Sequence, residues 1–282
     1  MKLIDDLNLA LQYALPHRLL TGLLRALSRW RLAPFKNAMI RLVIRRFQVD
    51  MDEAELSEPE DYPHFDAFFT RALKPGLRRF DATDDAILCP CDGTVSAAGR
   101  VQEGQLLQAK GISYRLEDLL ADSAAAEALA GGHFITLYLS PRDYHRIHQP
   151  FDGQLRRSIH VPGRLFSVAP FAVNGIPGLF ARNERLVALF DTATGPAAVI
   201  MVGAMLVSGI ETPWGGWFVP PHAKAIQQRD HKPALPLQRG SEFGRFHYGS
   251  TVIVVTSASA PMWRPGYQPG RRTRVGEVLA QP

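Results

Sequence analysis

Hydrophobic and polar positions change their spacing near residue 86. Before that point apolar residues recur at helical intervals, and a helix over residues 17–31 leaves Arg18, Arg25 and Arg29 opposite one apolar stripe. That stripe consists of Leu19, Leu20, Leu23, Leu24, Leu27 and Trp30. A second helix is predicted after Pro34, with an apolar side of Phe35, Met39, Leu42, Val43 and Phe47 and a basic side of Lys36, Arg41 and Arg45.

From residue 86 onward, short apolar runs alternate with Gly and Pro turns, which is typical of β-strands. The clearest runs are AILCPCDGTVSAAG, HFITLYLS, AAVIMVGAMLVSGI and STVIVVTS, and LEDLLADSAAAEALA has a helical pattern. We therefore predict an α+β fold in three parts: amphipathic helices over 1–50, a connector over 51–85, and a β-rich domain with helical insertions over 86–282. The connector is expected to contain a short helix and a turn at Pro75-Gly76.

The positive charge is concentrated in the first 50 residues. They hold nine Lys and Arg against three Asp, a net +6, whereas the whole chain carries +5. Two interpretations of these basic helices stay open. They pack their apolar stripe on the core, or they form an interfacial anchor whose Leu and Trp side chains enter the headgroup region of an anionic membrane. Nucleic acid is not an expected partner, because no recognisable nucleic-acid module accompanies the basic segment.

Cysteine usage favours a reducing compartment, and hydropathy predicts neither a secretory signal nor a membrane span. Cys89 and Cys91 are one residue apart, so they are poorly placed to bridge each other and are interpreted as free thiols. No secretory signal is evident. The longest charge-free stretch, 192–210, contains Thr, Gly, Ser and Pro, so we interpret it as buried strands rather than a membrane span.

Three short clusters carry reactive side chains. Asp92 lies in PCDGTV, His145 and His148 lie in LSPRDYHRIHQP, and Ser250 lies in the Gly-Ser-Thr that opens the last long apolar run. Asp92 and the Gly-Ser-Thr triplet each have a plain structural interpretation as turn chemistry. Together, Asp, His and Ser are the parts of an activated nucleophile, although YGSTV lacks the Gly-x-Ser-x-Gly pattern of many hydrolases. The two histidines have no third ligand at a diagnostic spacing, so no metal site is predicted.

Longer segments resemble the bacterial phosphatidylserine decarboxylase proenzymes, the pyruvoyl-dependent prokaryotic type I family. The resemblance runs along nearly the whole chain, in the family's order, through LQYALPHRL, FDAFFTRALKPGLR, CDGTV, QAKGISYRLEDLL, YLSPRDYHRIHQPFDG, VPGRLFSV, LFARNERLV, VGAMLVSGIETPW and GRFHYGSTVI. Two positions depart from the family pattern. Tyr248 stands where Leu or Met is common, and His247 stands where another polar residue is usual. Both departures adjoin the expected cleavage site.

This resemblance implies a self-processing enzyme. Asp92 and His148 would deprotonate Ser250, which would attack the carbonyl of Gly249 and cleave the chain between Gly249 and Ser250. The large chain (1–249) and the small chain (250–282) would remain together as a heterodimer. Ser250 would become a covalent pyruvoyl group, the implied cofactor, which forms a Schiff base with the substrate amine. His145 is the implied residue for proton transfer or substrate positioning, its alternative being a structural hydrogen bond beside His148.

The implied reaction is decarboxylation of phosphatidylserine to phosphatidylethanolamine in phospholipid biosynthesis. Because such a substrate stays in the bilayer, the resemblance favours the anchor interpretation and a peripheral location at the cytoplasmic face of the bacterial inner membrane. Candidate headgroup-binding residues, which could equally form structural ion pairs, are Lys110, Arg142, Arg164, Arg182 and Glu211. A serine hydrolase would instead keep an intact chain with a reactive Ser250, and a non-catalytic membrane-binding protein would keep an intact, inactive chain.

Overall fold

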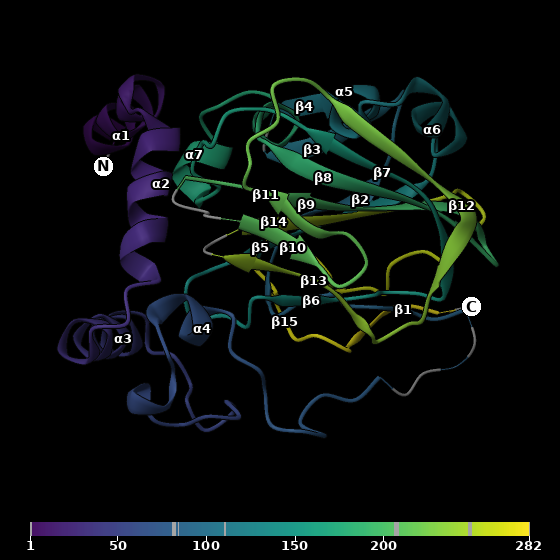
Figure 1. Ribbon diagram of the computed structural model, residues 1–282. Helices are drawn as coiled ribbons and strands as arrows, with labels where there is room; N and C mark the ends of the chain where they lie inside the picture. The colour runs from purple at the N-terminus through teal and green to yellow at the C-terminus, as the bar shows by residue number, and fades with distance from the viewer. Residues whose placement is uncertain are drawn as a thin grey trace.

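Three helices stand beside a β-rich body (Figure 1). They are α1 (Lys2–Ala14), α2 (His17–Ser28) and α3 (Ala33–Phe47). The computed structural model describes residues 2–80, 83, 85–109, 111–205, 209–247 and 250–281, with side chains from residue 8 onward. Lys110, Tyr248 and Gly249 therefore lie outside the described residues. Within the described part of the chain, no helix is long and apolar enough to span a membrane.

The body is built around an eight-stranded sheet in which every neighbouring pair is antiparallel. Its order is β12 (Gln227–Leu237), β7 (Gly153–Val161), β8 (Arg185–Thr192), β9 (Gly195–Val202), β14 (Ser250–Thr256), β5 (His133–Leu139), β2 (Gly93–Arg100) and β15 (Arg272–Thr273). A four-stranded sheet consists of β11 (Gly216–Val219), β10 (Gly209–Thr212), β13 (Glu242–His247) and β6 (Arg146–His148). The predicted α+β class is confirmed.

Smaller elements complete the body. Two-stranded pairs join β1 (Ile87–Leu88) to β16 (Val278–Ala280) and β3 (Gln105–Ala109) to β4 (Ile112–Arg115). The predicted helical insertion forms α5 (Leu116–Leu120) and α6 (Ser123–Ala128), and two further helices are α7 (Pro170–Val173) and α8 (Leu179–Arg182). Both cysteines are buried and free.

Strand β14 lies at the centre of the large sheet. Its sequence, STVIVVT, is rich in β-branched residues, which favour strands, and all seven of its residues are buried. It pairs with β5 on one side and β9 on the other, so both backbone edges are hydrogen-bonded. An unbroken apolar run is expected where both faces of a strand are covered.

The connector does more than link the helices to the sheet. It contains a 3₁₀ turn (Pro59–Asp61) and α4 (Phe65–Phe69), and it bends at Gly76, whose φ of 76° lies in the left-handed region. Its aromatic residues form a second, small core with α3, made of Ile40, Val49, Tyr62, Phe65, Phe68 and Phe69. The N-terminal helices are thereby tied to the segment that precedes the β-rich body.

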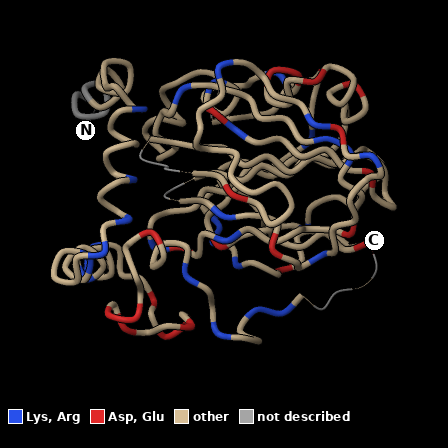
Figure 2. The backbone as a smooth tube through the Cα atoms, in the orientation of Figure 1, with Lys and Arg blue, Asp and Glu red and all other residues tan. Residues whose placement is uncertain are grey.

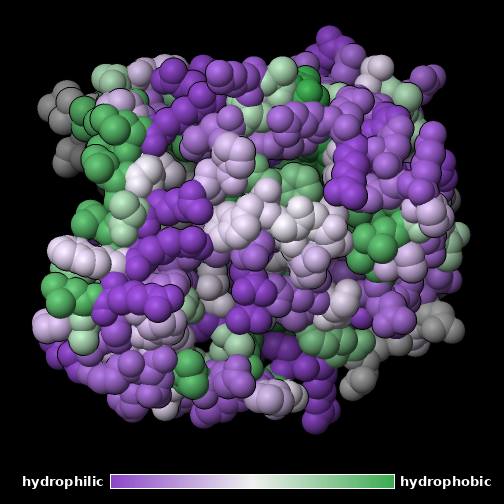
Figure 3. Space-filling model, viewed as in Figure 1, coloured by the Kyte–Doolittle hydropathy of each residue, from purple (hydrophilic) through white to green (hydrophobic). Residues whose placement is uncertain are grey.

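Helix α2 turns its polar side toward the protein. His17, Thr21 and Ser28 are buried, whereas much of the apolar stripe faces outward, with Leu19 and Leu23 exposed by 62% and 55%. In Figure 3, apolar side chains gather along the left edge, where Figure 1 places α1 and α2. This part of the stripe therefore does not pack on the protein core.

Two arginines, Arg25 in α2 and Arg29 directly after it, face the body instead. The guanidinium groups of Arg25 and Arg29 lie over the ring of Trp217 in β11, 5.2 and 5.0 Å from its centroid. Figure 2 shows basic residues spaced along α2. On α3, Lys36 of the predicted basic side is buried. Its side chain is buried because Nζ donates to the Pro59 and Glu60 carbonyls, at 3.3 Å each.

Candidate active site

The predicted residues converge at one end of the eight-stranded sheet, where β2 begins, β5 ends and β14 begins. Thr94, Tyr138 and Thr251 form one register row across these three strands. Asp92 lies two residues before Thr94, just ahead of β2, and Ser250 lies one residue before Thr251 in β14. His145 lies on the loop after β5, and His148 ends β6 of the smaller sheet. Residues far apart in the sequence are thus brought to the same end of the sheet.

Ser250 is the first residue of β14 and has no exposed surface. It pairs with Leu139, the last residue of β5. Its Oγ is buried and has no hydrogen-bond partner among the described residues. A buried hydroxyl without a partner is costly, so such a group in a folded protein calls for an explanation. Gly249, the predicted target of the Ser250 hydroxyl, lies outside the described residues.

Asp92 is held by groups from outside the three clusters. Its Oδ2 accepts from Arg78 Nη2 at 2.7 Å, and its Oδ1 accepts from the Val275 backbone N–H at 2.8 Å. Arg78 also donates to Glu53 Oε2 at 2.7 Å. Burial opposes the charge of Arg78, but these two carboxylates outweigh it and raise the pKa of the guanidinium. Sequence reasoning missed Arg78, although it ends one of the family-like segments.

His148 is a partly buried, neutral imidazole with hydrogen-bond partners at both ring nitrogens. Burial lowers its pKa, so the ring is neutral at neutral pH. Nδ1 lies 2.8 Å from the Gly240 carbonyl, which can only accept, so Nδ1 carries the proton and Nε2 keeps its lone pair. Nε2 accepts from the Tyr144 hydroxyl at 3.1 Å, and the ring stacks on Phe80 with 5.1 Å between centroids.

The predicted triad is not joined by direct hydrogen bonds. Among the described residues, none connects Asp92 to His148 or either of them to Ser250. Other groups bind these atoms instead. Arg78 and the Val275 N–H take the oxygens of Asp92, and the Gly240 carbonyl takes His148 Nδ1. The Asp92 charge still acts on His148, because it raises the pKa of that ring against the larger effect of burial.

His145 is completely buried and neutral. Its Nδ1 donates to the Asp143 carbonyl at 2.8 Å, which leaves Nε2 with a lone pair and no partner among the described residues. Burial, followed by the nearby charge of Arg71, lowers the pKa of His145 to about 3. Asp143 fixes this loop, since its Oδ2 accepts from both the backbone N–H and the hydroxyl of Ser140 at 2.7 Å.

Acid should weaken the folded state through these buried histidines. Their pKa values lie below the 6.5 of an unfolded histidine, so the unfolded chain binds more protons below that pH. The free energy of unfolding should therefore fall as the pH drops from about 6.5 toward 3. Urea unfolding of a Ser250→Ala chain at about pH 7.5 and about pH 5.5 measures this loss. His145→Gln should reduce the difference between the two values, and an unchanged difference would contradict the assignment.

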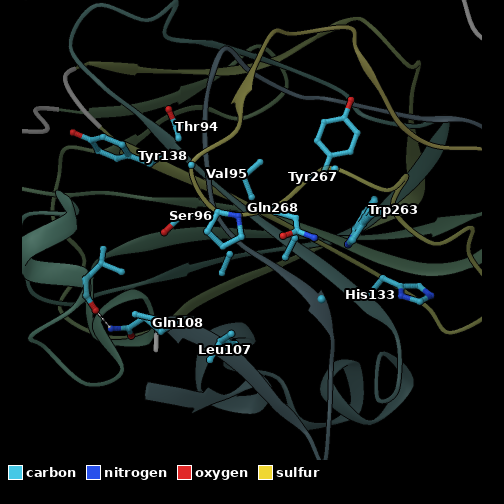
Figure 4. A pocket seen from close by; sticks show the side chains of 18 of the residues that line it. Thr94, Val95, Ser96, Leu107, Gln108, His133, Tyr138, Trp263, Tyr267 and Gln268 are labelled. Atoms are coloured by element: carbon cyan, nitrogen blue, oxygen red, sulfur yellow. Dashed lines mark hydrogen bonds between the residues drawn. The ribbon is translucent and has the colours of Figure 1, made fainter. Parts of the chain in front are cut away.

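Two cavities adjoin this end of the sheet. The smaller, about 440 Å³, is polar and is lined by Asp92, Asp143, Arg71 and Arg142 among others. Arg71 is 4% exposed, donates Nη2 to the Arg142 carbonyl at 3.0 Å, and has no ion-pair partner within 4 Å among the described residues. The larger, about 980 Å³, follows β2 and the C-terminal segment (Figure 4). Thr94 and Tyr138 of the register row line it, and both cavities escaped sequence reasoning.

The five candidate headgroup residues have different surroundings. Arg142 lines the polar cavity. Arg164 and Arg182 lie beside α1, where Arg164 Nη2 donates to the Tyr13 carbonyl at 3.2 Å and Arg182 lies 5.0 Å from the centroid of Phe166. Glu211 accepts from His247. Lys110 is outside the described residues.

The chain matches known proteins along almost its whole length. A family profile described as "Phosphatidylserine decarboxylase" matches residues 65–281, and another described as "PSD" matches residues 7–48. A Xanthomonas campestris pv. campestris protein named "Phosphatidylserine decarboxylase proenzyme" is 48% identical over 273 residues, covering 96% of this chain and 97% of its own. Proteins of the same name from Azotobacter vinelandii and Bordetella avium are 48% and 47% identical, covering 98% and 100% of this chain and 98% and 97% of their own.

These matches first define the class of the protein. It is an enzyme, which sets aside the non-catalytic membrane-binding interpretation. The first profile covers more than half of the chain, and the relatives exceed 45% identity over nearly all of it. The chain belongs to the phosphatidylserine decarboxylase family.

Proposed function

We propose that this enzyme decarboxylates phosphatidylserine to phosphatidylethanolamine with a pyruvoyl group that it makes from Ser250. One observation carries the proposal. The Ser250 hydroxyl is buried without a partner at the start of a central strand, with three further candidate residues at the same end of the sheet. A hydroxyl so placed is suited to attack the preceding carbonyl, because it need not break another hydrogen bond first.

The maturation step uses atoms of this chain and one water. Ser250 Oγ adds to the Gly249 carbonyl carbon while His148 Nε2 takes the hydroxyl proton, and the peptide C–N bond breaks to give an ester and a free Ser250 amine. Loss of the Ser250 Cα proton then expels the Gly249 carboxylate from Cβ. Water replaces the nitrogen at Cα, ammonia leaves, and the small chain starts with a ketone. Asp92 supports the positive charge that develops on His148.

The residues present fit such a group. Ser250 supplies its carbon atoms, and the buried position of Oγ keeps bulk water away from the reacting bond. The small chain would remain bound because three of its strands pair with the large chain: β14 between β5 and β9, β15 with β2, and β16 with β1. This interleaving supports the heterodimer of chains 1–249 and 250–282.

The pyruvoyl ketone would supply an electron sink for the serine amine of the substrate. His145 holds its proton on Nδ1 and presents a free Nε2, so it first accepts a proton and can then return it to the substrate carbon. Arg71 and Arg142 at the polar cavity offer positive charge to an anionic headgroup. These roles follow from where the donors and lone pairs lie.

The outward stripe of α2 supports attachment to the bilayer. Trp30, Leu32 and Leu42 are exposed as well, and all of these residues lie within the first 50 residues, which carry a net charge of +6. Apolar side chains beside basic ones suit the headgroup region of an anionic membrane. The enzyme would thus be a peripheral protein of the cytoplasmic face, at the surface that holds its substrate.

The activity is tested with vesicles of phosphatidylserine and a zwitterionic lipid. Purified protein should release carbon dioxide and form phosphatidylethanolamine in equal amounts. Phenylhydrazine, which derivatises ketones, should abolish both products and label the small chain only. Activity that survives phenylhydrazine, or release of free fatty acid or serine instead, would contradict the proposal.

His148→Gln should slow maturation by about 10²- to 10⁴-fold, because the amide cannot take the Ser250 proton. The rate is followed as the conversion of freshly translated chain into its two products. Tyr144→Phe is the matched control, since it removes only the hydroxyl that occupies His148 Nε2 and should leave cleavage at least as fast. Wild-type cleavage in His148→Gln would exclude His148 as the base.

A further inference from the structure

His247 stands where the family usually has another polar residue, and it is the last described residue before the expected cut. Only two residues separate it from Ser250, so three Cα steps of about 3.8 Å place the two Cα atoms within about 11 Å. The ring is buried at the end of β13. Whatever holds this ring therefore also holds the upstream side of the bond to be cleaved.

Two carboxylates hold the ring. His247 Nδ1 lies 2.8 Å from Asp66 Oδ1, and Nε2 lies 3.2 Å from Glu211 Oε2. A carboxylate accepts hydrogen bonds, so Asp66 and Glu211 engage the two ring nitrogens from opposite sides. Because both nitrogens face carboxylate oxygens, His247 is not placed to act as the base for Ser250. Its part must be positional.

The clamp extends to the N-terminal helices. Arg29, which follows α2, donates Nε and Nη2 to Asp66 Oδ2 at 3.2 Å each. Burial alone would raise the pKa of Asp66, but the hydrogen bonds from His247 and Arg29 outweigh it and the pKa is lowered. Ionised Asp66 therefore links Arg29, which directly follows α2, to His247, three positions before Ser250.

Packing fixes the plane of the ring. Trp217 stacks on His247 with 4.3 Å between centroids and an interplanar angle of 29°, while Arg29 covers the same indole. Gly209, opposite His247 in the sheet, makes room for this stack. A Cβ there would lie 2.4 Å from Trp217 Cζ3 and 3.2 Å from His247 Cδ2.

We propose that His247 is a positioning residue for self-cleavage: Asp66 and Glu211 clamp its ring, which keeps the chain on the upstream side of the scissile bond in place. This rests on the proposed self-cleavage and adds a residue to it. Misplacement of reacting atoms by about 1 Å can cost about 100-fold in rate. His247→Gln keeps a polar side chain but loses the ring that spans the two carboxylates and stacks on Trp217, so maturation should slow by about 10- to 100-fold.

The test measures cleavage of freshly translated full-length chain for the wild type, His247→Gln and His160→Gln. His160 is the matched control, because it is equally buried and its Nε2 lies 2.9 Å from the Glu184 carboxylate, away from the cleavage segment. It should mature at the wild-type rate. Once matured, His247→Gln should show wild-type kcat and KM per pyruvoyl group, which a general structural defect would not leave intact.

Glu211→Gln and Asp66→Asn distinguish a loss of positioning from misfolding of the His247→Gln variant. The Glu211 side chain is 30% exposed, so its amide should fold and still slow maturation. The double variant Asp66→Asn, His247→Gln should mature no more slowly than the slower of the two single variants, because both substitutions break the same contact. Wild-type maturation in both His247→Gln and Glu211→Gln would overturn this inference and leave self-cleavage standing. An uncut wild-type chain would overturn self-cleavage and this inference with it.

Discussion

Replacing Ser250 with alanine leaves a single chain of 282 residues and no detectable phosphatidylethanolamine. The substitution removes the oxygen that attacks the Gly249 carbonyl, and the next hydroxyl along β14, that of Thr251, belongs to a residue not bonded to Gly249. Since the pyruvoyl atoms come from Ser250 itself, maturation and decarboxylation fail together. Electrophoresis and a vesicle assay on the same sample measure both losses.

Ser257→Ala is the matched control for that experiment. Ser257 directly follows β14, is buried, and donates its hydroxyl to the Thr194 carbonyl at 2.6 Å. Its loss should cost some stability but leave both cleavage and activity. A Ser250→Ala chain that is still cut at the same bond would refute the mechanism. A wild-type chain that stays whole and reacts with a serine-directed phosphonate would favour the hydrolase interpretation.

The triple variant Leu19→Ser, Leu23→Ser, Leu27→Ser should bind anionic vesicles about 10³-fold more weakly. These side chains point away from the body, with exposed fractions of 62%, 55% and 44%. Burying a leucine contributes at least about 1.5 kcal/mol, so three together contribute about 4.5 kcal/mol. Because the residues do not support the core, maturation should be unchanged. Co-sedimentation with vesicles measures the binding.

Leu107→Ser provides the comparison, because Leu107 is similarly exposed at 45% but belongs to β3 in the β-rich body. It should bind vesicles as the wild type does. Deleting residues 1–48 should also release the protein from the vesicles. Vesicle binding that persists in the triple variant and in the deletion would place the anchor elsewhere in the chain.

The amphipathic pattern of α2 predicted its two faces but not which one is buried. A stripe of leucines has the same period whether it packs on a core or on a membrane. The structure shows that the polar side faces the protein, since Thr21 and Ser28 are buried whereas Leu19 and Leu23 are exposed. On that side Arg25 and Arg29 lie over Trp217 from a distant strand, a contact that no local periodicity contains.

The strands were more predictable than their pairing. The β-branched run at Ser250–Thr256 indicated a buried strand, and it is one. Its place between β5 and β9 depends on residues more than 40 positions away, which a local pattern cannot specify. The resemblance indicated Asp92, His145, His148 and Ser250. It did not indicate that the Gly240 carbonyl orients His148, because a backbone group leaves no mark on the side-chain sequence.

Intact-mass spectrometry of the purified protein tests the central claim most directly, because it reads the fate of Ser250 itself. The account predicts two chains, the smaller spanning the 33 residues from position 250 to 282 and lighter by one ammonia than a serine-started chain of that sequence. A single mass for the intact chain would contradict self-cleavage. A small chain that keeps the full mass of an N-terminal serine would show cleavage without formation of the pyruvoyl group.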